Sequence, residues 1–116
     1  MEVVAVEQCD FDAQKAYDAA AAIIESNPDI VGIACGNDDM ALGVVRALEE
    51  KDAKDQVAVV GVDFTEEAKA AIEEGTYDAT VAMSPYLMGK EAVIIMLKAL
   101  EGQDVSKVGD STPMQS

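Results

Sequence analysis

Short runs of β-branched residues alternate with longer amphipathic stretches along almost the whole chain. The runs predict strands, and the stretches between them carry apolar residues at helical spacing, as in Ala16, Ala20 and Ile24. Turn and capping residues such as Asn27-Pro28 and Ser84-Pro85 separate the two kinds of segment. We therefore expect strands at residues 3–6, 30–35, 57–62 and 79–82, and helices at about 13–26, 38–51, 65–74 and 85–101.

Four strand–helix units in a row predict an α/β fold: a parallel sheet of about four strands, flanked by helices and joined by right-handed crossovers. Aromatic residues are scarce, with two Phe, three Tyr and no Trp, as is typical of a sheet that helices bury on both faces. A chain of 116 residues has room for one domain, so we expect a single lobe over residues 1–102 and a polar tail over 103–116. Cys9 and Cys35 are more often small core residues than a bonded pair, and whether they pair stays open.

The charge balance limits the partners. Eight basic residues stand against 23 acidic ones, which leaves a net charge of −15. Such a field repels phosphate backbones and anionic lipid, so we expect no nucleic-acid partner and no membrane docking. No run reaches the roughly 20 apolar residues that span a bilayer. The residues from Met1 to Val4 lack the basic and apolar regions of a signal peptide, so we expect neither membrane insertion nor a signal peptide.

The residue types argue against catalysis. The sequence has no histidine, which removes the usual general base and the commonest transition-metal ligand. Neither a G-x-S-x-G elbow nor a phosphate-binding glycine loop is present. We therefore expect no catalytic residue, no cofactor and no resident metal. A small metal-dependent enzyme is the weaker alternative, because an acidic pocket for Mg²⁺ or Ca²⁺ would draw on Asp10, Asp12, Asp38, Asp39 and Asp63.

Polar residues collect where the predicted strands end, which is the edge at which parallel sheets bind ligands. Carboxylates and side-chain amides form paired hydrogen bonds with sugar hydroxyls, and an aromatic ring covers the C–H face of a sugar. Asn37, Asp63 and Phe11 would be such a set. An ordinary structural role is the alternative for each, since the Phe11 ring would also fit as a staple on its own helix. Loop residues of this kind are also common helix N-caps, the candidates being Asp12, Asn37 or Asp38, and Thr65.

Several motifs of the sequence are similar to those of a known family. Residues 10–12 read D-F-D, and residues 36–43 read G-N-D-D-M-A-L-G. N-P-D-I at 27–30, V-V-G-V-D at 59–63 and A-T-V-A at 79–82 follow the same order. With these motifs the chain resembles the type I periplasmic sugar-binding proteins, especially their ribose- and allose-binding branch. The agreement in order and spacing runs from about residue 3 to 105, and N-D-x-M-A-L-G is its most specific part.

The resemblance implies a non-enzymatic, flavodoxin-like lobe of a solute-binding protein of a bacterial sugar importer, periplasmic or extracytoplasmic in the parent family. In that family the aromatic residue of D-F-D packs on the sugar, while the Asn of N-D and the Asp of G-x-D bind its hydroxyls. By resemblance these roles fall on Phe11, Asn37 and Asp63. Met83 stands where the family usually has a hydroxyl-binding glutamine. The implied ligand is a pentose or a hexose.

The resemblance also implies that parts are missing, because the family has two lobes that close around the sugar. This chain is similar to the C-terminal part alone, without the N-terminal lobe and without the strand that usually sits centrally in the sheet. We therefore expect weak or no binding alone, and a homodimer or strand-exchanged dimer that covers apolar surface at residues 92–97. Two alternatives remain: the effector-binding core of a lactose-repressor-type regulator, and a dimerising α/β scaffold that binds nothing.

Overall fold

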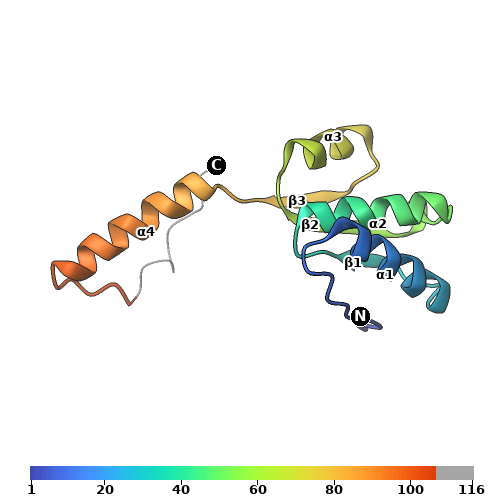
Figure 1. The fold of residues 1–116 in the computed structure, drawn as a ribbon, viewed down its shortest axis with the longest axis horizontal. Coiled ribbons are helices and arrows are strands. Elements are labelled where there is room, and N and C mark those ends of the chain that lie inside the picture. Colours follow the sequence, from blue (N-terminus) through green and yellow to red (C-terminus); the bar gives the residue numbers. More distant parts are fainter. Residues whose placement is uncertain (107–116) are drawn as a thin grey trace. The chain divides into compact units, whose positions relative to one another are not determined.

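The computed structural model describes residues 1–106, and its contacts divide the chain into two compact units, Met1–Ala82 and Met83–Ser116. The elements along the chain are shown in Figure 1. In order they are α1 (Ala13–Ser26), β1 (Gly32–Ala34), α2 (Asp38–Glu50), the 3₁₀ turn η1 (Lys54–Gln56), β2 (Ala58–Asp63), α3 (Glu66–Glu74), β3 (Ala79–Ala82) and α4 (Pro85–Leu100). The predicted boundary of the lobe at residue 102 stays a prediction, and the predicted tail at 103–116 falls largely outside the described residues.

The strands of the first unit form one parallel sheet in the order β1-β2-β3. Ile33 is in register with Val59, and Gly61 is in register with Thr80. The predicted α/β class and parallel sheet are therefore confirmed. All the predicted helices form, and each lies within one or two residues of its expected bounds. The turn η1 was not expected.

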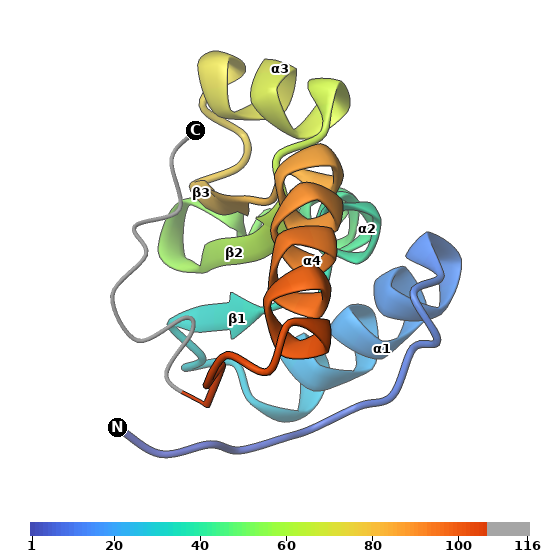
Figure 2. The same cartoon turned by 90° about the vertical axis from the view of Figure 1, so that its left-hand side faces the viewer.

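The predicted strand at residues 3–6 is wrong. This segment has no regular secondary structure, and Val3 and Val6 are 73% and 85% exposed. Figure 2 shows it running past α1 to the N-terminus without joining the sheet. A strand is stable only when a neighbouring strand takes up its backbone hydrogen bonds. Within residues 1–106 the sheet holds three strands, and none of them pairs with this segment.

Each helix begins at a side chain that caps it. Asp12 accepts a hydrogen bond from the Lys15 backbone N–H at 2.8 Å, and Ser84 precedes Pro85 at the first turn of α4. Asn37 and Thr65 cap α2 and α3 in the same way. The cap predictions are therefore confirmed, with Asn37 and not Asp38 as the cap of α2. These caps fix the point at which each loop after a strand turns into a helix.

The core lies between the sheet and α2. Val59 and Gly61 of β2 face this helix and are buried, as is Leu48 on α2 itself. The helices α1 and α2 pack side by side, as Figures 1 and 2 both show. The opposite face of the sheet is exposed and carries Gly32, Ala34, Ala58, Val60, Ala79 and Val81.

The described part of the second unit, up to residue 106, consists mainly of α4, and none of the residues of this helix is buried. Its exposed large apolar side chains are Tyr86, Met88, Val93, Met96, Leu97 and Leu100. Such a surface needs cover from another apolar surface in water. Among the described residues, no helix combines the length and the apolar character required to cross a bilayer.

Candidate functional site

The loop before α1 places an aromatic ring beside the loop before α2. Phe11 has a left-handed backbone conformation, with φ 57°, and its side chain is 70% exposed. A Cβ atom added to Gly36 would lie 3.8 Å from Cε1 of Phe11. The ring thus lies next to the residue that precedes Asn37, and its exposure leaves it free to cover an apolar face of a ligand.

Asn37 is half-buried at the carboxyl end of β1, where its side chain already has one structural task. Its Oδ1 accepts the backbone N–H of Met40 at 3.0 Å. Among the described residues the Asn37 amide nitrogen donates to no protein group in this structure. Asn37 therefore serves as a helix cap through its oxygen and retains a donor for a ligand.

Asp63 ends β2 and is followed by a turn of unusual backbone conformation. The φ angles of Asp63 and Phe64 are 121° and 63°, both in the region that favours glycine. Non-glycine residues hold such angles only when their surroundings fix them, at a cost of about 1–3 kcal/mol each. This turn leaves Asp63 half-buried and Phe64 exposed at the edge of the sheet.

The buried carboxylate of Asp38 joins the Asn37 loop to the turn after Asp63. Asp38, the first residue of α2, is 0% exposed. Its Oδ2 accepts the Thr65 backbone N–H at 2.9 Å, while its Oδ1 accepts the hydroxyls of Tyr77 at 2.9 Å and Thr80 at 2.6 Å. Burial, and next the hydrogen bond to Asp38, raises the pKa of Tyr77 far above its ordinary value. From the sequence, Asp38 was expected only as a cap or a metal ligand, because the partners of its carboxylate lie far along the chain.

Met83 is the first residue of the second unit. It directly follows β3 and is 36% exposed. Its thioether is a weak acceptor and offers no donor, unlike the amide that the resemblance implies at this position. The structure thus brings together the loops of Phe11 and Asn37 and the turn after Asp63.

The acidic residues considered as metal ligands do not gather. Within residues 1–106, no three His, Cys, Asp or Glu side chains form a group that could hold a metal ion. Asp10 forms an ion pair with Lys15, their oxygen and nitrogen 2.6 Å apart. The hydrogen bond to Lys15 lowers the pKa of Asp10 below its ordinary value. Asp38 has its own protein partners, so this set is dispersed in the structure.

Cys9 and Cys35 are both free thiols, and both pack against the core of the first unit. Burial raises the pKa of Cys35 to about 11, and the charge of Cys9 contributes in the same direction. A thiol with this pKa is protonated at neutral pH and is a poor nucleophile. The interpretation of these residues as small core side chains is therefore the one that the structure supports.

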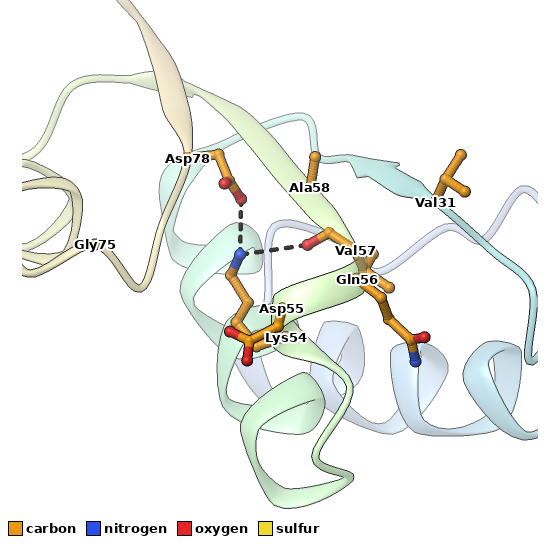
Figure 3. Close-up of a pocket in the computed structure, with 8 residues that line it drawn as sticks. All are labelled: Val31, Lys54, Asp55, Gln56, Val57, Ala58, Gly75 and Asp78. Carbon is orange, nitrogen blue, oxygen red and sulfur yellow. Dashed lines mark hydrogen bonds and ion pairs between the residues drawn. The ribbon is translucent and has the colours of Figure 1, made fainter.

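A shallow cavity of about 360 Å³ opens at the opposite edge of the sheet, around the amino ends of the strands. Figure 3 shows that Lys54 crosses it and contacts Asp78 and the carbonyl of Val57. Asp78 also accepts the Val59 backbone N–H at 2.8 Å. These hydrogen bonds and the Lys54–Asp78 ion pair join η1 to the beginning of β3. This edge of the sheet therefore has a structural role, and we call Lys54 and Asp78 the clamp.

The sequence matches one family model over almost its whole length. The model describes a periplasmic binding protein domain, and the match covers residues 1–104. The chain belongs to this periplasmic binding protein family. Its resemblance to the ribose- and allose-binding branch is confirmed by the relatives found among known proteins.

Binding proteins for two sugars are among these relatives. The chain is similar to a D-allose-binding periplasmic protein of Escherichia coli, with 37% identity over 85% of this chain and 32% of that protein. It is similar to a ribose import binding protein of Bacillus subtilis, with 35% identity over 92% of this chain and 34% of that protein. The chain therefore spans about a third of the length of these relatives.

Solved structures of the family confirm the fold. The chain is similar to a glucose-galactose binding protein of Geobacillus stearothermophilus, with a TM-score of 0.79 and 30% identity over 90% of this chain and 37% of that one. A solute-binding protein of an ABC transporter from Actinobacillus succinogenes with bound D-allose gives a TM-score of 0.75 and 28% identity, over 89% of this chain and 37% of that one. Periplasmic binding proteins thus share this arrangement of strands and helices.

Proposed function

We propose that this chain is a sugar-binding lobe of a solute-binding protein that serves a bacterial sugar importer. The observation that carries the proposal is the meeting of three polar loops at the carboxyl edge of one parallel sheet. Phe11 lies beside the loop of Asn37. The Asp38–Thr65 hydrogen bond ties that loop to the turn after Asp63. A ligand at this edge contacts residues from all three loops at once.

The chemistry of these side chains suits a neutral sugar. The amide nitrogen of Asn37 donates to a hydroxyl oxygen, and the carboxylate of Asp63 accepts from a hydroxyl group. The exposed ring of Phe11 covers the C–H face of a pentose or hexose. A net charge of −15 disfavours an anionic ligand at the same place.

The proposed role is binding without catalysis. The relatives named above are binding proteins for sugars, one of them for import, which supports the transport branch over a lactose-repressor-type regulator. In the proposed parent protein a second lobe closes over the sugar and supplies the remaining contacts. A single open lobe leaves one side of the ligand in water, so we expect a Kd of about 1 mM or weaker, near −4 kcal/mol.

The experiment is an NMR titration of the ¹⁵N-labelled chain with ribose, allose, galactose and glucose, each up to concentrations that saturate a weak site. We expect one sugar to shift the amide signals around residues 36–38 and 63–65. Asn37→Asp keeps the oxygen that caps α2 and removes the amide donor, so it separates binding from helix capping. Asp63→Asn removes the charge at the other loop.

Gln56→Ala, at the opposite edge of the sheet, is the matched control and should bind as the unaltered chain does. Loss of the shifts in Asn37→Asp and Asp63→Asn, but not in Gln56→Ala, supports the proposal. If no sugar moves any amide signal, or if the shifts survive both site variants, the sugar-binding proposal is wrong for this chain. The non-binding dimerising scaffold then becomes the better description.

We also propose that the chain forms a homodimer when it is alone. Two features support this: the apolar surface of α4, and the unpaired segment at residues 3–6 together with the outer edge of β1. A second copy covers the former by helix contact or the latter by strand exchange. In the proposed parent protein the N-terminal lobe covers the former surface, and the central strand of this lobe's own sheet takes the latter place.

A further inference from the structure

Asp38 is the one charged side chain among the described residues that is completely buried. A buried carboxylate is costly unless hydrogen bonds replace the water that it loses. Asp38 receives three such bonds, and it lies in the first turn of α2, where the helix dipole favours a negative charge. Both oxygens of the Asp38 carboxylate therefore have hydrogen-bond partners within the first unit.

The three bonds differ in what they hold. The hydroxyls of Tyr77 and Thr80 contact Oδ1 and anchor the carboxylate to β3 and the residues just before it. The Thr65 backbone N–H contacts Oδ2 and comes from the loop between β2 and α3. Only this third bond reaches the turn that carries a proposed sugar ligand.

That turn has an unusual backbone conformation. Asp63 and Phe64 both have positive φ, and Thr65 follows them directly as the cap of α3. The Thr65 side chain is anchored to the Ala68 N–H at 3.1 Å, and its backbone N–H to Asp38 at 2.9 Å. The turn is therefore held from one side by its own helix and from the other by α2.

Asp38 is also the neighbour of Asn37, whose side chain caps α2. The Asp38 carboxylate thus links the Asn37 loop to the Asp63 turn, beyond the point where the pairing of β1 with β2 ends. We propose that Asp38 is a positioning residue for sugar binding, which fixes the Asp63–Phe64 turn against the Asn37 loop through the Thr65 amide. This inference rests on the proposed function and deepens it, because Asp38 itself is buried and does not touch the ligand.

The test combines a backbone readout, which needs no sugar, with the sugar titration. In the unaltered chain, a through-hydrogen-bond NMR coupling should link the Thr65 amide nitrogen to the Asp38 carboxyl carbon. The positive φ of Asp63 and Phe64 should give strong intraresidue HN–Hα NOEs. Asp38→Ala should weaken those NOEs. It should also lower the affinity for the sugar by about tenfold or more, as expected for loss of a charge-assisted hydrogen bond.

Asp38→Asn is the conservative variant that should rescue both readouts. A backbone N–H only donates, whereas hydroxyls both donate and accept. The oxygen of the introduced side-chain amide therefore faces Thr65, and its nitrogen faces the hydroxyls of Tyr77 and Thr80. Val45→Ala, which removes core volume from the same helix, is the control for stability and should leave the affinity of the folded molecules unchanged.

The outcomes are distinct. The proposal is overturned if the coupling to Asp38 is absent, if Asp38→Ala keeps the turn and the affinity, or if Val45→Ala loses affinity by the same factor. If Asp38→Ala does not fold, the coupling in the unaltered chain and the rescue by Asp38→Asn still decide. If no sugar binds the unaltered chain, the proposed function fails, whereas the NOEs still report whether Asp38 holds the turn.

Discussion

Gly61 shows how one residue determines the packing around the buried carboxylate. A Cβ atom at this position would lie 2.3 Å from the Tyr77 hydroxyl oxygen and 3.1 Å from Oδ1 of Asp38. Both distances are too short for van der Waals contact with carbon. Tyr77 is itself 2% exposed, and its hydroxyl is held by the hydrogen bond to Asp38. Only glycine leaves room for the Tyr77–Asp38 hydrogen bond.

Gly61→Ala should therefore destabilise the chain by about 2–4 kcal/mol, the sum of overpacking and a strained buried hydrogen bond. Urea denaturation followed by circular dichroism measures this loss. Gly32→Ala in β1 is the control, because its Cβ atom would meet only the Ala58 carbonyl at an ordinary 3.7 Å. If both variants lose a similar amount of stability, the effect comes from replacing a strand glycine in general and not from the hydrogen bonds of Asp38.

Asp78 gives the chain a dependence on acidic pH. The hydrogen bond from Lys54, and next that from the Val59 N–H, lowers the pKa of Asp78 in the folded state. A lowered pKa means that the stabilisation is present above the unfolded-state pKa and is lost as pH falls through the folded value. The side chain of Asp78 is 43% exposed, so solvent screening keeps the contribution below about 1 kcal/mol.

We expect Asp78→Asn to lower the free energy of unfolding at pH 7 and to leave it nearly unchanged at pH 2.5. The measurement is urea denaturation of both proteins at a series of pH values between 7 and 2.5. Asp55→Asn, in the same cavity, is the control for the change in net charge. An equal dependence on pH in the unaltered chain and in Asp78→Asn would contradict the role of the clamp.

At the scale of the elements, the pair α1 and α2 depends on close backbone approach. A Cβ atom at Gly43 would lie 2.2 Å from the Ala13 carbonyl oxygen and 3.0 Å from its carbon. These are backbone atoms at the beginning of α1, so they cannot move without the helix. Close contact at this point brings α1 against the core through Ala16 and Ala20.

Gly43→Ala should cost about 2 kcal/mol or more, although alanine favours a helix by about 1 kcal/mol. Gly89→Ala in α4 is the matched variant, because its added Cβ atom would meet nothing within 4 Å beyond the neighbouring backbone of its own helix. It should be neutral or stabilising. If thermal unfolding shows that Gly43→Ala is as stable as Gly89→Ala, the packing of α1 on α2 does not depend on the close approach of Gly43 to Ala13.

The helices could be predicted from the local sequence pattern, whereas one of the strands could not. The caps Asp12, Asn37, Thr65 and Ser84 act at short range within their own helices, so their positions alone predicted where each helix begins. The run at residues 3–6 has as strong a β-branched pattern as the true strands, yet it remains unpaired. Its state depends on a neighbouring strand, which no local pattern reports.

For the whole molecule, exposed apolar surface and net charge have opposite effects on the association of two copies. The surface of α4 favours association, whereas a net charge of −15 makes two copies repel each other. Salt screens the charge and leaves the apolar attraction in place. Association should therefore become stronger as the ionic strength rises.

Light scattering over a range of protein concentrations should show a mass that approaches twice that of the chain, at lower concentration in 500 mM than in 50 mM NaCl. Leu97→Lys, on α4, should shift the chain toward the monomer. Gln56→Lys adds the same charge at an exposed position of the first unit and should have little effect. A monomer mass at every protein and salt concentration would exclude the dimer.

The sequence by itself determined the α/β class, the bounds of the helices and the placement of Asn37 and Asp63 at the carboxyl ends of strands. These properties follow from spacing and capping, which act over a few residues. Tertiary structure alone decided that residues 3–6 stay unpaired, that Asp38 is buried, and that one carboxylate spans two loops of the site. Asp38 and Thr80 are 42 residues apart, and their contact exists only once β3 lies beside β2 in the folded sheet.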